Sequence, residues 1–67
     1  MASTIGIRVQ EARRARGWTQ EQLARKVRVT RQHIGRVEDT GSVSLDLLRR
    51  IAAALSVDAA DLFRGTP

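Results

Sequence analysis

The sequence predicts an all-α protein, a compact bundle of five short helices, and three observations support this. Apolar residues recur at helical spacing in several stretches, most of these stretches follow a residue that can cap a helix, and the only proline is the last residue. The 67 residues are expected to form one domain over 1–67, of a size at which a single core is marginally sufficient. Trp18 and Phe63 are the only Trp, Phe or Tyr residues, so this core is expected to be aliphatic.

The first helix is expected from about Ile5 to Arg16, after a cap at Ser3 or Thr4. Gly17 is suited to end it in the left-handed conformation. Trp18 follows at a junction, where we expect it to be buried between this helix and later ones. The apolar stripe of the helix consists of Ile5, Val9 and Ala12, which share one face.

Two shorter helices are expected between Gln20 and Glu38, joined by a turn of only a few residues. Thr19 and Thr30 are good N-caps for them, because a threonine hydroxyl can accept a hydrogen bond from a free N–H group of the first turn. Ala24 is small enough to let the two helices meet at a steep angle. The two apolar stripes are Leu23, Ala24 and Val27 in the first helix, and Ile34 and Val37 in the second.

The last part of the chain predicts two more helices. The composition of 39–43 indicates a turn, after which Ser44 can cap a helix from Leu45 to about Leu55. Asp58 and Asp61 approximate a capping box for a short fifth helix. The expected core stripe of the fourth helix is Leu45, Leu48, Ile51, Ala52 and Leu55.

If Ile34 and Val37 face the core, the helical wheel directs Arg31, Gln32 and Arg36 outward, with Gly35 between them. The arginine fork matches O6 and N7 of guanine, and glutamine can pair with N6 and N7 of adenine. This ridge therefore suits the edges of base pairs in a major groove. Base contact is favoured for Arg36, while base and phosphate both remain open for Arg31.

Composition narrows the function classes. The formal charge of +5 favours a polyanionic partner such as nucleic acid, although general solubility explains it equally well.

There is no cysteine, and a lone His33 is not expected to ligate a metal. No apolar run is long enough to span a bilayer, and the N-terminus does not resemble a signal peptide, so a cytoplasmic protein is expected. No enzyme activity, cofactor or metal is expected, because no nucleophile–base arrangement or phosphate loop is present.

The motif Gly17-Trp18-Thr19-Gln20-Glu21-Gln22-Leu23-Ala24, followed by Val29-Thr30-Arg31, Ile34 and Val37-Glu38, resembles the phage-repressor/Cro-like helix-turn-helix family of the XRE type. The resemblance runs from about Ile5 to Phe63. It implies a lambda-repressor-like fold in which the second and third helices form the DNA-binding unit, usually in a two-fold dimer. Small controllers of restriction–modification systems are similar in size.

The resemblance also implies roles for individual residues. Gln20 is similar to the glutamine that braces against phosphate and the first recognition residue, and Arg13 and Glu38 are similar to a structural ion pair of the family. Arg28 departs from the family pattern, which prefers glycine at this turn position. Base contacts are expected from Arg31, Gln32 and Arg36, and contacts to the DNA backbone from Thr19, Gln20, Arg28, His33 and Ser44.

A homodimer is expected through Val57, Leu62 and Phe63, because a short last helix cannot cover its own apolar face. For Leu62, closing the core of the single chain is the stronger alternative. The predicted function is a sequence-specific, double-stranded DNA-binding transcription regulator on a pseudo-palindromic operator, associated with the nucleoid when bound. No small-molecule effector is expected. The alternative is an antitoxin or another protein-binding module that binds DNA secondarily.

Overall fold

The computed structural model describes residues 4–62, and within this range all regular secondary structure is helical. The all-α prediction is confirmed, with the predicted number of helices in the predicted order. The helices are α1 (Thr4–Ala15), α2 (Gln20–Val27), α3 (Arg31–Thr40), α4 (Leu45–Leu55) and α5 (Ala59–Leu62).

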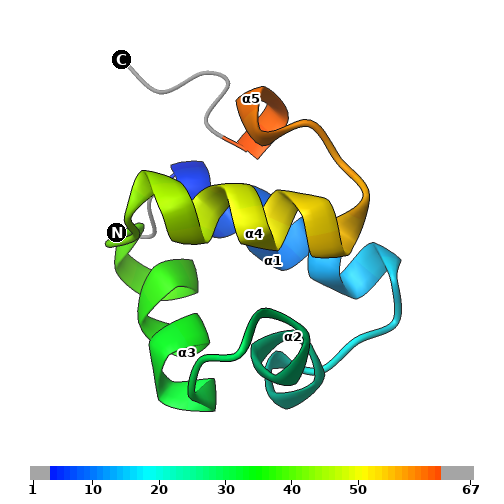
Figure 1. The fold of residues 1–67 in the computed structure, drawn as a ribbon, viewed down its shortest axis with the longest axis vertical. Coiled ribbons are helices and arrows are strands. Elements are labelled where there is room, and N and C mark those ends of the chain that lie inside the picture. Colours follow the sequence, from blue (N-terminus) through cyan, green and yellow to red (C-terminus); the bar gives the residue numbers. More distant parts are fainter. Residues whose placement is uncertain (1–3, 63–67) are drawn as a thin grey trace.

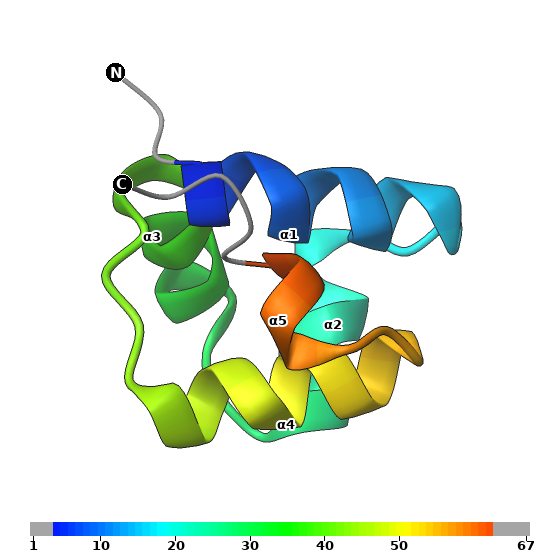
Figure 2. The ribbon, with the colours of Figure 1, turned by 90° about the horizontal axis from the view of Figure 1, so that it is seen from above.

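The helices surround a single core (Figure 1, Figure 2). In Figure 2, α1 and α4 form two opposite sides of the molecule and run in the same general direction. Figure 1 shows α5 on one side of α4, and α2 and α3 on the other. The helix α3 packs against both α1 and α2, and α2 also packs against α4. The third helix is therefore fixed on one side, and its other side lies at the surface.

Three N-caps form as predicted. The hydroxyl groups of Thr19, Thr30 and Ser44 each accept a hydrogen bond of 3.1 Å from the N–H group three residues further on. These bonds satisfy donors that have no partner inside the helix. At the other end of α1, Gly17 takes the predicted left-handed conformation with a φ of 74°.

The helix α3 is longer than predicted. Asp39 and Thr40 belong to it, whereas the composition of 39–43 indicated a turn. The helix ends at Gly41, which has a φ of 73° and whose N–H donates to the carbonyl of Val37. The hydroxyl of Thr40, the last residue of the helix, donates to the carbonyl of Arg36. The turn therefore begins at the glycine, the residue that adopts the left-handed region without strain.

The core is aliphatic, as predicted, but one position of α4 was assigned wrongly. Leu45 is 55% exposed, and Leu47 is buried in its place. Both leucines fit a helical stripe with Leu48, so the packing of the first turn decided between them. The buried hydrophobic residues are Val9, Leu23, Ala24, Val27, Ile34, Val37, Leu47, Leu48, Ile51, Ala52, Leu55 and Leu62.

Trp18 is only partly buried. It packs against the core from the edge, and two cations lie over its ring. The ammonium of Lys26 is 4.5 Å from the ring centroid and the guanidinium of Arg16 is 5.4 Å away. Arg16 also donates two hydrogen bonds to the carbonyl of Leu55, which ties the end of α1 to the end of α4.

Candidate nucleic-acid interface

The helices α2 and α3 are joined by a tight turn through residues 28–30. Arg28 occupies the left-handed region, with φ 61° and ψ 47°, and its N–H donates to the carbonyls of Ala24 and Arg25. The next N–H, of Val29, donates to the carbonyl of Ala24 at 3.0 Å. Because these bonds close α2, the chain can reverse at once into the cap of α3 at Thr30. Two short helices are thereby held at a fixed angle to one another.

The inner side of α3 is packed closely against α1. Ile34, Val37 and Glu38 are buried on this side. Gly6 of α1 lies directly against the backbone of α3, so that a Cβ at this position would be 2.1 Å from the carbonyl oxygen of Glu38. Only a glycine permits this approach. The closeness of the two helices therefore depends on the absence of a side chain at Gly6.

A buried ion pair joins the same two helices. Nε of Arg13 is 2.7 Å from Oε2 of Glu38, and Nη2 is 3.0 Å from Oε1. The third nitrogen, Nη1, donates to the carbonyl of Trp18 at 2.7 Å. The two side chains are only 8% and 1% exposed. The structure thus brings together the residues expected to pair, and the planar, two-bond geometry fixes the end of α3 relative to α1.

Gln20 belongs to this buried network. Its Nε2 donates to Oε1 of Glu38 at 3.2 Å, so α2 is joined to the same carboxylate as α1. Its side chain also lies beside Gly35, since an ideal Cβ there would be 3.8 Å from Oε1 of Gln20. Within residues 4–62 it makes no hydrogen bond to Arg31, the first residue of the expected recognition ridge. Here Gln20 braces the end of α3 through Glu38.

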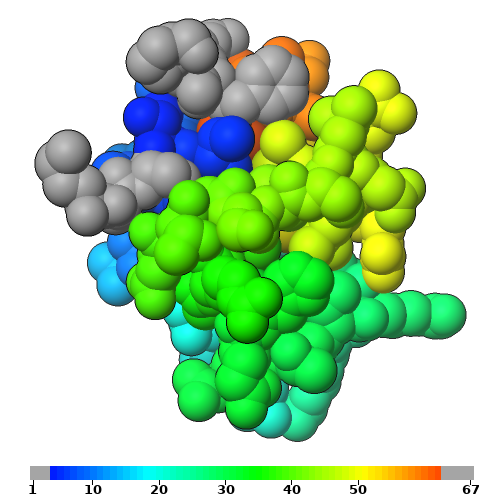
Figure 3. Space-filling view, turned by 90° about the vertical axis from the view of Figure 1, so that its left-hand side faces the viewer, coloured from blue at the N-terminus to red at the C-terminus, as the bar shows by residue number. Residues whose placement is uncertain are grey.

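The outer side of α3 presents four exposed polar side chains, two of which are arginines. None of these four side chains has a hydrogen bond or ion pair within the described part of the chain. Figure 3 shows the face on which α3 reaches the surface, in green, with no other helix over it. These residues are Arg31, Gln32, His33 and Arg36.

The remaining predicted site residues lie in several places. Thr19 and Ser44 use their hydroxyl groups as caps of α2 and α4, both at exposed helix starts. Val57 is half-buried against the core. Leu62 is 2% exposed and closes the core of the single chain, the alternative favoured for it from the sequence. Phe63 lies outside the described residues.

Two residues with clear roles were not singled out from the sequence. Gly6 stands inside a helical pattern, which is itself a signal of close packing, but the sequence does not say what approaches it. Arg50 donates a hydrogen bond to the carbonyl of Val27 and so joins α4 to the end of α2.

Neither a metal site nor a membrane-spanning helix is found in residues 4–62. No group of three His, Cys, Asp or Glu side chains within residues 4–62 is placed to hold a metal ion. In the same range, the helices are too short or too polar to cross a membrane.

Comparison with known proteins agrees with this geometry. The helix-turn-helix family model matches residues 9–62, so the chain belongs to the helix-turn-helix family, in its XRE type. The fold and the family together define a DNA-binding regulator. No curated protein sequence matches the chain.

Solved structures give more particular likenesses. The restriction-modification controller protein C.AhdI from Aeromonas hydrophila has a TM-score of 0.84 and 36% identity, over 90% of this chain and 92% of that one. The hypothetical transcription factor NHTF from Neisseria has a TM-score of 0.82 and 32% identity, over 88% and 69%. The clp gene regulator ClgR from C. glutamicum has a TM-score of 0.82 and 26% identity, over 90% and 79%.

Proposed function

We propose that this protein is a dimeric, sequence-specific regulator that places α3 in the major groove of double-stranded DNA. The observation that carries the proposal is the contrast across α3. Arg31, Gln32 and Arg36 are exposed and have no partner within residues 4–62, whereas the opposite side is held by the buried carboxylate of Glu38. A ridge of unpaired donors on a firmly held helix suits the reading of base edges.

Each side chain of the ridge has a defined chemical role in this proposal. Arg36 donates two hydrogen bonds to O6 and N7 of a guanine, and Gln32 pairs with N6 and N7 of an adenine. Arg31 stands at the start of the helix, where a base and a phosphate are both in reach. Each good two-bond contact discriminates against the wrong base by about 1–3 kcal/mol.

Contacts to the DNA backbone would set the register of the protein on the duplex. The starts of α2 and α4, capped by Thr19 and Ser44, carry N–H groups that suit phosphate oxygens. The side chains of Arg28 and His33 are exposed near the start of α3. Gln20 acts in this scheme mainly by positioning, since its amide is engaged with Glu38.

A two-fold dimer would bring two α3 helices to half-sites about 34 Å apart, one helical turn of DNA. Phe63 and Val57 are the proposed dimer contacts. Leu62, which the core of the single chain already buries, could contribute only at its edge. We further propose that the protein works in the cytoplasm on the nucleoid, in the manner of a restriction–modification controller, and without a small-molecule effector. The likeness to C.AhdI over 92% of that chain supports this proposal.

The test is a selection of bound sequences from a random duplex library, followed by affinity measurements over a range of salt concentrations. Arg36→Ala should weaken binding to the selected site by roughly 5- to 150-fold, the equivalent of 1–3 kcal/mol, and weaken binding to random DNA far less. Arg14→Ala removes the same charge from an exposed position on α1 and serves as the control. An equal loss on both DNAs would make Arg36 a phosphate contact. Failure to select any sequence would contradict the proposal.

A further inference from the structure

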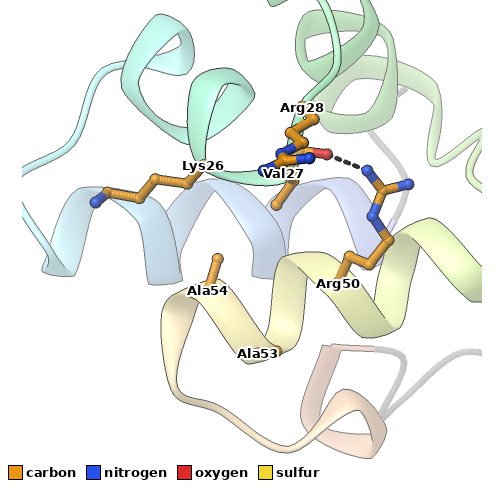
Figure 4. Close-up of a pocket in the computed structure, with 6 residues that line it drawn as sticks. All are labelled: Lys26, Val27, Arg28, Arg50, Ala53 and Ala54. Carbon is orange, nitrogen blue, oxygen red and sulfur yellow. Dashed lines mark hydrogen bonds between the residues drawn. The ribbon is translucent and has the colours of Figure 1, made fainter.

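A groove separates the end of α2 from the second half of α4, away from the recognition ridge (Figure 4). It has a volume of about 450 Å³, and Arg31, Gln32 and Arg36 take no part in it. The side chains of Val27, Ala53 and Ala54 give it an apolar floor. Two arginines border the groove at one end, and the side chain of Lys26 points away from them at the other (Figure 4). The lining residues are Lys26, Val27, Arg28, Arg50, Ala53 and Ala54.

The three cations of the groove are only partly engaged. Within residues 4–62, the guanidinium of Arg28 has no hydrogen bond or ion pair, and the ammonium of Lys26 contacts only the face of Trp18. Arg50 donates one hydrogen bond to the carbonyl of Val27. Arg50 also forms an ion pair with the largely exposed carboxylate of Asp46, which lies 3.8 Å from Nη1. The charge around the groove is therefore strongly positive.

The end of α2 accounts for only one of these cations, Arg50, which donates to the carbonyl of Val27. A helix C-terminus favours positive charge because its last carbonyls lack partners. Here the carbonyl of Val27 is bound by Arg50, and those of Ala24 and Arg25 by the N–H of Arg28. At the end of α4, the N–H of Ser56 donates to the carbonyls of Ala52 and Ala53. An anion in the groove would thus meet cations and few free carbonyl oxygens.

We propose that this groove binds an acidic segment of a partner protein, in which carboxylates alternate with small apolar side chains. The carboxylates would pair with Lys26, Arg28 and Arg50, and the apolar side chains would cover the floor of valine and alanine. A DNA backbone offers phosphates, but its deoxyribose rings project no apolar side chains that could fill such a floor. This function goes beyond DNA binding and does not depend on it. Because the pairs would be exposed, each contact is weak and the affinity should be modest.

The proposal can be tested by NMR on the full chain labelled with 15N. The probe is a capped octapeptide of alternating Asp and Val, and the control peptide has Asn in place of each Asp. The acidic peptide should shift the amide signals of residues 26–28 and 50–54, and the control peptide should leave them in place. The absence of these shifts, or equal shifts with both peptides, would overturn the proposal.

Two matched variants test whether the peptide binds in the groove. Ala53→Glu puts a negative charge on the floor and should weaken peptide binding at least threefold. Ala60→Glu makes the same change on α5, which lies on the other side of α4 from α2, and should leave the affinity unchanged (Figure 1). Both variants should bind duplex DNA equally, so a failure of this proposal is distinguishable from a failure of the proposed DNA binding. Equal peptide affinity in the two variants would overturn it.

Arg28→Gly excludes unfolding as the cause of a lost interaction. It removes one cation of the groove and puts a glycine where the backbone is left-handed, so the thermal midpoint should not fall. Peptide affinity should nevertheless drop at least threefold. Because Arg28 is also a proposed phosphate contact, the effect of DNA is read at residues 50–54 of α4. An unchanged peptide affinity, or displacement of the peptide by duplex DNA with shifts at residues 50–54, would overturn the proposal. The second result would assign the groove to the DNA interface.

Discussion

The two sides of α3 differ in how many of their polar side chains have hydrogen-bond partners within the protein. On the inner side, both oxygens of Glu38 accept hydrogen bonds, from Arg13 of α1 and Gln20 of α2, and the side chain is 1% exposed. On the outer side, Arg31 and Arg36 have no partner within residues 4–62. The inner side determines where the helix lies. The exposed side chains Arg31 and Arg36 do not help to hold the helix in place, and they are free to bind a ligand.

Comparison with a second, exposed ion pair shows why burial matters for the contribution of the Arg13–Glu38 pair to stability. Arg25 and Glu21 pair along α2 at 3.3 Å, with side chains 77% and 62% exposed. Water solvates both groups when they separate, so such a pair contributes about 0–1 kcal/mol. Removing one partner of a buried pair leaves the other charge without solvation. Loss of one partner is therefore expected to lower stability much more in the buried pair than in the exposed pair.

The largest effect is expected from Glu38→Ala. It leaves the guanidinium of Arg13 and the amide of Gln20 without their acceptor, and should lower the free energy of unfolding by about 3–5 kcal/mol. Glu21→Ala is the control on the exposed pair and should cost less than about 1 kcal/mol. Urea unfolding followed by circular dichroism measures both. Similar losses in the two variants would contradict the difference between the two pairs.

Gly6 of α1 and Gly35 of α3 should respond in opposite directions to the same substitution. Gly6→Ala puts a methyl group 2.1 Å from a backbone oxygen of α3, which cannot move alone, so we expect a loss of about 1–3 kcal/mol. Gly35→Ala meets only ordinary contacts near Gln20 and should gain about 0.5–1 kcal/mol from helix propensity. Thermal unfolding compares the two variants. A loss of stability in Gly35→Ala would show that the outer side is packed more closely than it appears.

If Gly35→Ala is stable, its DNA affinity answers a separate question. A loss of binding with retained stability would show that the helix must approach the groove closely at Gly35. Unchanged binding would leave Gly35 as a position without a functional role.

The smallest effect is expected at the turn that leads into α3. Arg28 adopts a left-handed conformation, which costs a residue with a side chain about 1–2 kcal/mol. Glycine relieves this cost, but part of the gain is lost because glycine has more conformational freedom in the unfolded chain. Arg28→Gly should therefore raise the free energy of unfolding by about 0.5–1 kcal/mol in a urea titration. Ser56, the other non-glycine residue with positive φ, offers the matched substitution Ser56→Gly outside the helix-turn-helix. A destabilised Arg28→Gly would mean that the arginine side chain stabilises the turn.

Local signals predicted most of the helix boundaries. The hydroxyl caps at Thr19, Thr30 and Ser44 and the glycine at the end of α1 act within a few residues, so the sequence shows them directly. The error at Leu45 arose because two leucines fit the same period near the start of a helix. The true end of α3 was missed because turn-forming residues outweighed Gly41, which alone terminates the helix.

The sequence by itself determined the order of helices, their caps and the outward ridge of α3, because each depends on residues three or four positions apart. Only the tertiary structure decided what lies against Gly6, how completely Glu38 is bound, and that Lys26 and Arg50 border one groove. These contacts join residues 18 or more positions apart. They exist because of the way the helices pack, and no periodicity along the chain records that packing.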